Sequence, residues 1–407
     1  MFRYSLILVT FLILLFTQSA SIAGDSLRSI VRYEKTITTP FGFDSPDKFA
    51  GALCDDVLFL YLNQAENDSL RFCIVDLSTN SIREQYVAIP PAIEHDEIDQ
   101  VAGISVGPDK LAMLSKFREL ILLDRSTDNT LTFNSIHELN ESYSAIDLNN
   151  THIVASRIYD AHPKSSPDKR LIQILEPATM SPIRETKPKF DPIEFAYFRP
   201  SQWISANNHL VAAANAASYD IALYDLDLNY LETITRVLPS WWKPIDPVMI
   251  AHLTENIPPE KPRDKISAIS ALYYAGSKLN YVQFLGDSVL AVRISHGEHK
   301  DGFQRYIWDF WQLQQNSWHL WKTDLEQHYV HQQPDTVIDS TFYPMQAAYN
   351  MQYMNARHFV VLRFSSGLSP LGLSFKEFSK KEDDFIATQS PFLAIDIFNW
   401  QWDVNNE

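Results

Sequence analysis

The sequence predicts an all-β fold, a six-bladed β-propeller built from four-stranded blades. Short polar turns introduce runs of alternating apolar residues at six places, and the first apolar positions of these runs are 57, 111, 153, 210, 289 and 359. A second hairpin follows most of these runs before the next polar turn begins. One four-stranded sheet for each repeat of this length is typical of a propeller.

Each predicted blade contains a hairpin at its polar turn. In chain order the six turns are Asp55-Asp56, Pro108-Asp109, Asn149-Asn150, Asn207-Asn208, Gly286-Asp287 and Ala356-Arg357. Turn residues between alternating apolar runs also mark second hairpins at residues 71–89, 120–136, 171–181, 221–237 and 306–324. An additional strand at residues 30–37 is predicted to pair with residues 392–398, which closes the ring without a long free edge.

The N-terminus has the features of a secretory signal peptide. An apolar core at residues 6–16 follows Arg3, and the small residues Ser21 and Ala23 form a cleavage site. We therefore predict that residues 1–23 are removed and that residues 24–407 form a single exported domain in the periplasm, on the cell surface or outside the cell. An uncleaved membrane anchor is the alternative, but the core is shorter than a spanning helix.

The composition excludes some classes of partner. The chain carries a formal net charge of −16, which repels phosphate backbones and makes nucleic acid a poor partner. No later segment reaches the length of a transmembrane helix. The sequence leaves the oligomeric state open.

Cys54 and Cys73 are the two cysteines of the chain. If their hairpin turns near Asn67, Cys73 lies opposite residue 60, about 20 Å along the strand from Cys54. That separation is too large for a disulfide. We therefore predict two free, mostly buried thiols.

Residues 106–112, VGPDKLA, resemble the S-P-D-G-K-x-I/L-A turn of TolB-type propeller repeats. They depart from that pattern by having Gly107 in place of the serine and no glycine after Asp109. The resemblance implies a TolB-like six-bladed propeller of the bacterial envelope. It carries over no catalytic residues.

Long segments are predicted to gather on one face of the ring. In a four-stranded blade with strands a to d, the a–b and c–d turns lie on one face, and the b–c loops and d–a connections lie on the other. The long segments fall in the second class, at residues 88–100, 159–169, 186–201, 239–277, 296–304 and 325–345. Long loops on a rigid scaffold are a common place for binding, although drift in tolerant loops is the alternative.

The largest insert, residues 239–277, is predicted to be a small, partly helical cap over this long-loop face. It opens with Trp241 and Trp242, which either present aromatic rings to a partner or pin the cap to the propeller. The residues on this face that we predict to bind a ligand are Tyr159, Arg199, Trp241, Trp242, His296 and Arg305.

Two groups of residues on the same face have the chemistry of metal ligands. His296, His299 and Asp301 offer imidazoles and a carboxylate for zinc or a similar ion. His95 and Asp99 belong to an acidic group that calcium would accept. Neither group has a spacing that fixes its geometry, so a solvated polar loop is the alternative for both.

Ser105 lies in the pattern G-x-S-x-G of serine hydrolases, at residues 103–107. That motif requires a strand before the serine and a helix after it. Here a polar turn and another apolar run follow, in step with the five sister hairpins, which indicates an ordinary inner strand. A serine nucleophile is therefore disfavoured.

The function that the sequence favours is a non-catalytic one. We predict an exported binding or scaffold protein that recognises a protein or a glycan with its long-loop face and needs no cofactor. The alternative is a metal-dependent hydrolase or lyase that holds a divalent cation at the channel mouth through His296, His299 and the acidic residues 95–99.

Overall fold

The computed structural model describes residues 27–42, 50–65, 69–91, 101–115, 119–139, 143, 145–149, 152–157, 171–189, 203–215, 218–245, 255, 276–298, 304–326, 342–343, 352–365 and 392–402. The predicted signal peptide and nearly all of the insert between residues 246 and 275 lie outside these ranges. The helices that we expect in the cap therefore stay a prediction.

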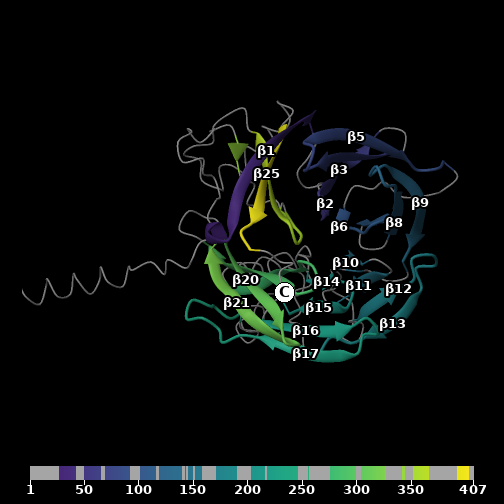
Figure 1. Ribbon diagram of the computed structural model, residues 1–407. Helices are drawn as coiled ribbons and strands as arrows, with labels where there is room; N and C mark the ends of the chain where they lie inside the picture. The colour runs from purple at the N-terminus through teal and green to yellow at the C-terminus, as the bar shows by residue number, and fades with distance from the viewer. Residues whose placement is uncertain are drawn as a thin grey trace, which may run out of the picture.

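Six antiparallel sheets stand in a ring, as predicted (Figure 1). Blades 1 and 2 consist of β2 (Ala50–Cys54), β3 (Val57–Ala65), β4 (Ser69–Asp76), β5 (Ser81–Ala88), β6 (Val101–Val106), β7 (Lys110–Ser115), β8 (Glu119–Arg125) and β9 (Leu131–Glu138). Blades 3 and 4 consist of β10 (Ala145–Leu148), β11 (Ile153–Ser156), β12 (Ile172–Leu175), β13 (Pro182–Thr186), β14 (Ile204–Ala206), β15 (Leu210–Ala214), β16 (Asp220–Asp225) and β17 (Tyr230–Thr235).

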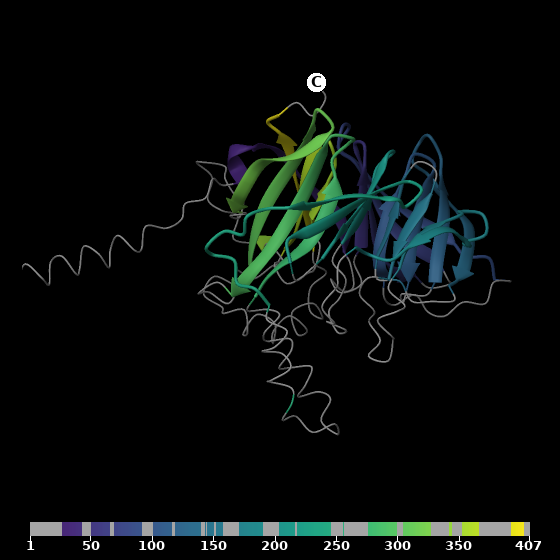
Figure 2. The same ribbon diagram turned by 90° about the horizontal axis from the view of Figure 1, so that it is seen from below.

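Blade 5 contains the longest set of strands, β18 (Ser277–Phe284), β19 (Val289–Glu298), β20 (Gln304–Gln314) and β21 (Ser317–Glu326). In each of the first five blades the chain runs outward, so the first strand is innermost and the fourth lies at the rim (Figure 1). Seen from the side, the strands run between the two faces of the ring (Figure 2).

Blade 6 is built from both ends of the chain. Its strands are β23 (Gln352–Met354), β24 (His358–Ser365), β25 (Phe392–Trp400) and, at the rim, β1 (Val31–Gly42), which follows the 3-10 turn η1 (Leu27–Ser29). A two-residue strand, β22 (Phe342–Tyr343), also pairs with β24. β1 pairs with β25 in an antiparallel register that places Ile37 opposite Ile395. The predicted closure of the ring is confirmed.

Apolar side chains fill the spaces between neighbouring blades. Because side chains alternate across a strand, each blade presents one apolar face to the blade before it and one to the blade after it. The cluster between blades 5 and 6 contains Trp308 and Phe359, and the cluster between blades 4 and 5 contains Trp311 and Trp318. The tryptophans of the β20–β21 hairpin thus belong mainly to the core.

Asparagine side chains stabilise three of the a–b turns. The Oδ1 atoms of Asn149, Asn207 and Asn355 accept hydrogen bonds from the backbone N–H three residues later, at 2.7–2.9 Å. This is the local bond that favours Asn in turns. Their Nδ2 atoms donate to a backbone carbonyl in the turn of the next blade, as Asn355 does to Asp55 at 2.6 Å. One side chain therefore shapes a turn and ties two blades together.

Both cysteines are free, as predicted. Cys73 pairs with Leu60 across β3 and β4, the register expected from the turn position. Cys73 is buried, and Cys54 is partly exposed with its Sγ 3.1 Å from the NH1 of Arg125.

We expect Cys73 to be unreactive toward a thiol reagent in the folded protein. Burial raises the pKa of Cys73 to about 12, so at pH 8 the side chain is almost entirely the unreactive thiol. A native titration with Ellman's reagent at pH 8 should leave Cys73 unmodified, and both cysteines should react after denaturation in urea. Fast modification of Cys73 under native conditions would contradict this packing.

Candidate functional site

Three of the predicted binding residues meet at the end of blade 5 where β18 begins and β19 ends. The rings of Trp241 and Trp242 lie with centroids 6.3 Å apart, and Trp241 packs edge-on against the imidazole of His296 at 5.1 Å. Trp242 also contacts Tyr219, at a centroid distance of 6.2 Å. These residues lie on the face of blade 5 that packs against blade 4.

Ser277 fixes the position of this aromatic group. Its backbone N–H donates to the carbonyl of Lys243 at 2.7 Å, and the N–H of Lys243 donates to Ser277 Oγ at 2.9 Å. The Oγ lies 2.6 Å from His296 Nδ1. Because Oγ accepts from Lys243, its own hydrogen is available to His296 Nδ1. The chain that enters the insert is thus fastened to β18 and β19.

The two tryptophans differ in exposure. Trp242 is 7% exposed and belongs to the core between blades 4 and 5, so it pins the start of the insert to the propeller. Trp241 packs against the same core but is only partly buried. His296 is 8% exposed. Trp241 therefore offers a partly exposed aromatic ring that is held in place by its contacts with Trp242 and His296.

Of the remaining predicted site residues, only Arg305 lies within the described ranges. The backbone of Arg305 on β20 lies opposite His296 on β19. Tyr159, Arg199, His299, Asp301, His95 and Asp99 lie outside the described residues. Within the described ranges no three His, Cys, Asp or Glu side chains are grouped so as to hold a metal ion.

A layer of buried polar side chains lies on the opposite face of blade 5, toward blade 6. Arg293 on β19 donates from Nε to Asn280 Oδ1 at 2.9 Å and from NH1 to Gln352 Oε1 at 3.0 Å. Its guanidinium also lies over the rings of Tyr281, Tyr306 and Trp308, at 4.9–5.6 Å. Lys278 projects from β18 on the same face and is 3% exposed. Neither cation was predictable from the sequence, because no local pattern marks a lysine or arginine as buried.

Burial lowers the pKa of Lys278 to about 7. Between pH 7 and the ordinary lysine value of about 10.4, the unfolded chain therefore binds a proton that the folded chain does not. The contribution of Lys278 to stability must rise with pH in this window, by at most about 1.4 kcal/mol per pH unit.

We expect wild-type protein to gain stability relative to a Lys278→Met variant between pH 7 and pH 9.5. Urea unfolding of both proteins at the two pH values measures the difference. The paired comparison cancels the contribution of the other titrating groups. A difference in free energy of unfolding that is the same at both pH values would contradict the lowered pKa.

Ser105 is part of an inner strand, as predicted. Its Oγ donates to Asp147 Oδ1 at 2.7 Å and accepts from the N–H of Leu148 at 2.7 Å. Asp147 Oδ2 accepts from the N–H of Ala206 at 2.8 Å. These bonds join the inner strands of blades 2, 3 and 4. The hydroxyl and the carboxylate are thus engaged in holding blades together.

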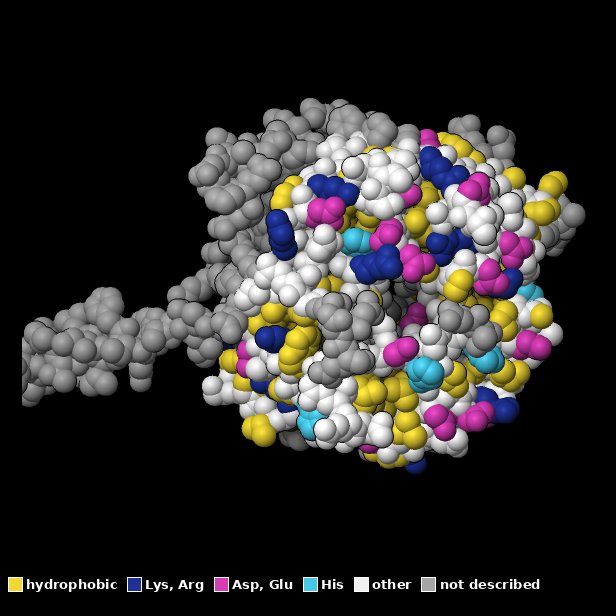
Figure 3. All heavy atoms as spheres, in the orientation of Figure 1, with side chains coloured by type: hydrophobic (Ala, Val, Ile, Leu, Met, Phe, Trp, Pro, Cys, Tyr) yellow, Lys and Arg dark blue, Asp and Glu magenta, His cyan; other side chains and the backbone are white. Residues whose placement is uncertain are grey.

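The opposite face of the ring carries the tight a–b turns. Charged side chains of both signs gather around a central hollow on this face (Figure 3). One group spans blades 1 and 6, where His358 lies 2.8 Å from Asp56 and Arg357 lies 3.2 Å from the same carboxylate. The two turns were predictable from the sequence, but the contact between them was not, because Asp56 and His358 are 302 positions apart.

Comparisons with known proteins support the fold. A solved structure from Bacteroides fragilis, named "Putative exported protein", superimposes with a TM-score of 0.51 at 10% identity, covering 91% of this chain and 96% of its own. A member of the DUF4221 family from Bacteroides vulgatus superimposes with a TM-score of 0.51 at 9% identity, covering 91% of this chain and 98% of its own. No family model and no curated protein matches the sequence.

The described part of the chain has no helix with the length and apolar character needed to cross a membrane.

Proposed function

We propose that this protein is an exported, TolB-like propeller that binds a protein or glycan partner without catalysing a reaction. The name of the similar structure from Bacteroides fragilis and the signal-peptide pattern of residues 1–23 support export. The proposed compartment is the periplasm, the cell surface or the outside of the cell. The proposed contact surface is the long-loop end of blade 5.

The arrangement of Trp241 is the observation that carries this proposal. Its indole is partly exposed, and it packs against the rings of His296 and Trp242. A fixed aromatic ring loses little conformational freedom on binding and suits both the apolar face of a sugar and the anchor residue of a protein interface. Arg305, Tyr159 and Arg199 are further binding residues that we propose from the sequence alone.

A Trp241→Ala variant tests the proposal. Mature wild-type protein is labelled and applied to a glycan array and to separated envelope proteins of the source organism. For any ligand that the wild type binds, we expect the variant to lose at least about tenfold in affinity, which is the loss typical of truncating an aromatic anchor. Binding on the array assigns a glycan, and binding only to a protein band assigns a protein.

Tyr86→Ala is the matched control, because Tyr86 is a 54% exposed aromatic residue on β5 in blade 1. It should retain binding. Trp242 does not serve as a probe, since its burial makes its replacement a test of folding. If Trp241→Ala folds and retains the affinity of the wild type for every ligand, the proposed site is wrong.

A further inference from the structure

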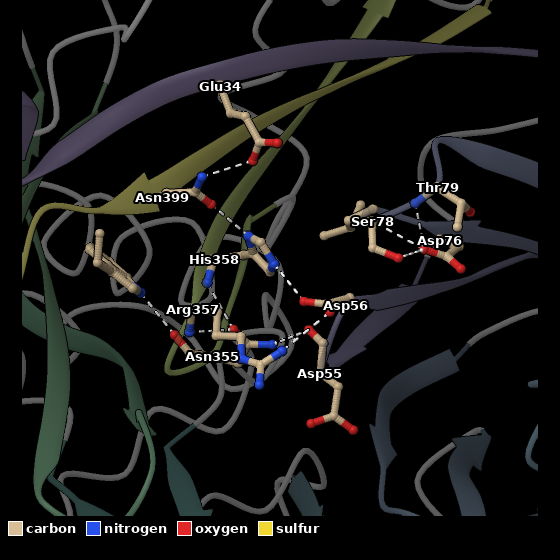
Figure 4. Close-up of polar contacts among 12 residues, drawn as sticks. Glu34, Asp55, Asp56, Asp76, Ser78, Thr79, Asn355, Arg357, His358 and Asn399 are labelled. Atoms are coloured by element: carbon tan, nitrogen blue, oxygen red, sulfur yellow. Dashed lines mark hydrogen bonds and ion pairs between the residues drawn. The ribbon is translucent and has the colours of Figure 1, made fainter. Parts of the chain in front are cut away.

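The hydrogen bonds around His358 join the first and the last blade of the ring (Figure 4). His358 Nε2 lies 2.8 Å from Asp56 Oδ1 in the a–b turn of blade 1, and Nδ1 lies 2.8 Å from Asn399 Oδ1 on β25. The side chain of His358 is 13% exposed and that of Asp56 is 32% exposed. The imidazole therefore bridges the two blades in a partly buried position.

The orientation of Asn399 is fixed by Glu34. Asn399 Nδ2 donates to Glu34 Oε2 on β1 at 2.9 Å, and an ionised carboxylate can only accept. The amide oxygen of Asn399 must then point toward His358. Both ring nitrogens of His358 face an acceptor, one an amide oxygen and the other a carboxylate oxygen. Only the doubly protonated imidazolium has a hydrogen for each.

We propose that closure of the ring is linked to a proton on His358, because its imidazolium clamps Asp56 of blade 1 to Asn399 and, through Asn399, to the N-terminal strand β1. Loss of the proton leaves a lone pair on one ring nitrogen, and this lone pair faces the lone pair of an oxygen acceptor. The contact of blades 6 and 1 around His358, which we call the seam, then loses either the bond from His358 to Asp56 or the bond from His358 to Asn399. Turning the amide of Asn399 does not repair this, because its oxygen would then face Glu34.

The other charged groups around the seam belong to each element that packs there. They are Glu34 and Lys35 on β1, Asp55 and Asp56 in the β2–β3 turn, Asp76 at the end of β4, and Arg357 before β24. Burial alone would raise the pKa of Asp76, but hydrogen bonds from Ser78 and Thr79 lower it. Lys35 Nζ donates to the carbonyl of Leu77 at 2.6 Å. Carboxylates, lysine and arginine ordinarily keep their charge between pH 5.5 and 8.5, the range in which histidine titrates.

The sign of the linkage follows from the number of protons bound. The closed seam sets an acceptor against each ring nitrogen of His358, and only the doubly protonated ring can donate to both, so closure is favoured at low pH and weakens as pH rises. Asp56 must stay ionised, so the seam also weakens when the solution becomes acidic enough to protonate carboxylates. The seam is therefore strongest in mildly acidic solution.

Amide hydrogen exchange of β1 measured between pH 5.5 and 8.5 tests this proposal in the mature protein. Protection of β1, corrected for intrinsic exchange and divided by the protection of β7 in blade 2, should fall by about three- to tenfold over this range, because one of the two hydrogen bonds of the imidazole is lost. Using β7 as the reference removes pH effects on global stability.

Three variants make the result specific. His358→Gln and Asp56→Asn should each abolish the pH dependence of the ratio, and either one suffices if the other does not fold. Arg357→Gln is the control: it removes an ion pair to the same Asp56 carboxylate at a 63% exposed side chain, and it should retain the pH dependence. A ratio in wild-type protein that does not change with pH, or a pH dependence that persists in His358→Gln or Asp56→Asn, would overturn the proposal.

Discussion

Replacing Arg236 with methionine is expected to cost about 3–5 kcal/mol of folding free energy, because it strands a buried carboxylate. Arg236 NH1 donates to Asp309 Oδ2 at 2.6 Å, and the two side chains are 7% and 0% exposed. Asp309 also accepts from the Tyr219 hydroxyl at 2.8 Å and from the N–H of Asp324 at 2.8 Å. Without Arg236 the carboxylate of Asp309 stays buried and lacks the charged hydrogen-bond donor that compensates for its burial.

The network connects blade 4 to blade 5, since Arg236 follows β17 and Asp309 lies on β20. Burial alone would lower the pKa of Arg236, but Asp309 and Asp324 raise it, so the guanidinium stays charged. Breaking a buried pair by removing one partner is far more costly than losing an exposed pair. The predicted loss is a large part of the ~5–15 kcal/mol that stabilises an ordinary protein.

Arg184→Met is the matched control for this prediction. Arg184 forms an ion pair with Asp227 between the rims of blades 3 and 4, but the two side chains are 55% and 70% exposed. We expect its loss to change stability by less than about 1 kcal/mol. Urea unfolding of the two variants and the wild type measures both changes. If Arg236→Met lowered the free energy of unfolding no more than Arg184→Met does, the predicted cost of breaking the buried pair would be wrong.

Removing β1 is expected to open the ring. A chain that begins at residue 43 lacks the eight register pairs that join β1 to β25, from Val31–Trp400 to Gly42–Phe392. It also loses the bond from Thr36 Oγ1 to Asp396 Oδ1, at 2.6 Å. The free edge of β25 is then a template for another strand. We expect this chain to self-associate and to lose its cooperative unfolding transition.

A chain that begins at residue 27 keeps η1 and β1 and is the control, which should keep the association state of the mature protein and unfold in a single transition. A peptide of residues 27–42 added to the shortened chain should restore that state, since an extended peptide can add a strand to an exposed sheet edge. Sedimentation velocity and thermal unfolding follow both properties. A chain that begins at residue 43, keeps the association state of the mature protein and unfolds cooperatively would contradict closure by β1.

The sequence was sufficient to predict the parts of the fold that repeat. Each polar turn that precedes an alternating run became the a–b turn of a blade, and the opposition of Leu60 and Cys73 followed from one turn position. The pairing of residues 30–37 with 392–398 was predictable because a ring needs its last edge covered.

The polar contacts between blades were not predictable from local patterns. Arg236 and Asp309 are 73 positions apart, and nothing near either residue shows that it is buried. The carboxylate of Asp147 accepts hydrogen bonds from Ser105 and Ala206 in neighbouring blades. Such pairs depend on the register of two separate sheets, which one sequence does not specify. Loop lengths assigned Trp241, Trp242 and His296 to one face of the ring, and the ring of Trp241 packs against those of the other two.

The metal content of the mature protein tests the non-catalytic account most directly, because the alternative function requires a bound divalent ion. Protein purified by gel filtration without chelator is analysed for zinc, calcium, manganese and iron. The account predicts far less than one ion per chain. A divalent ion near one per chain, lost on replacing His296 or His299 with alanine, would contradict it and assign the channel mouth to metal-dependent chemistry.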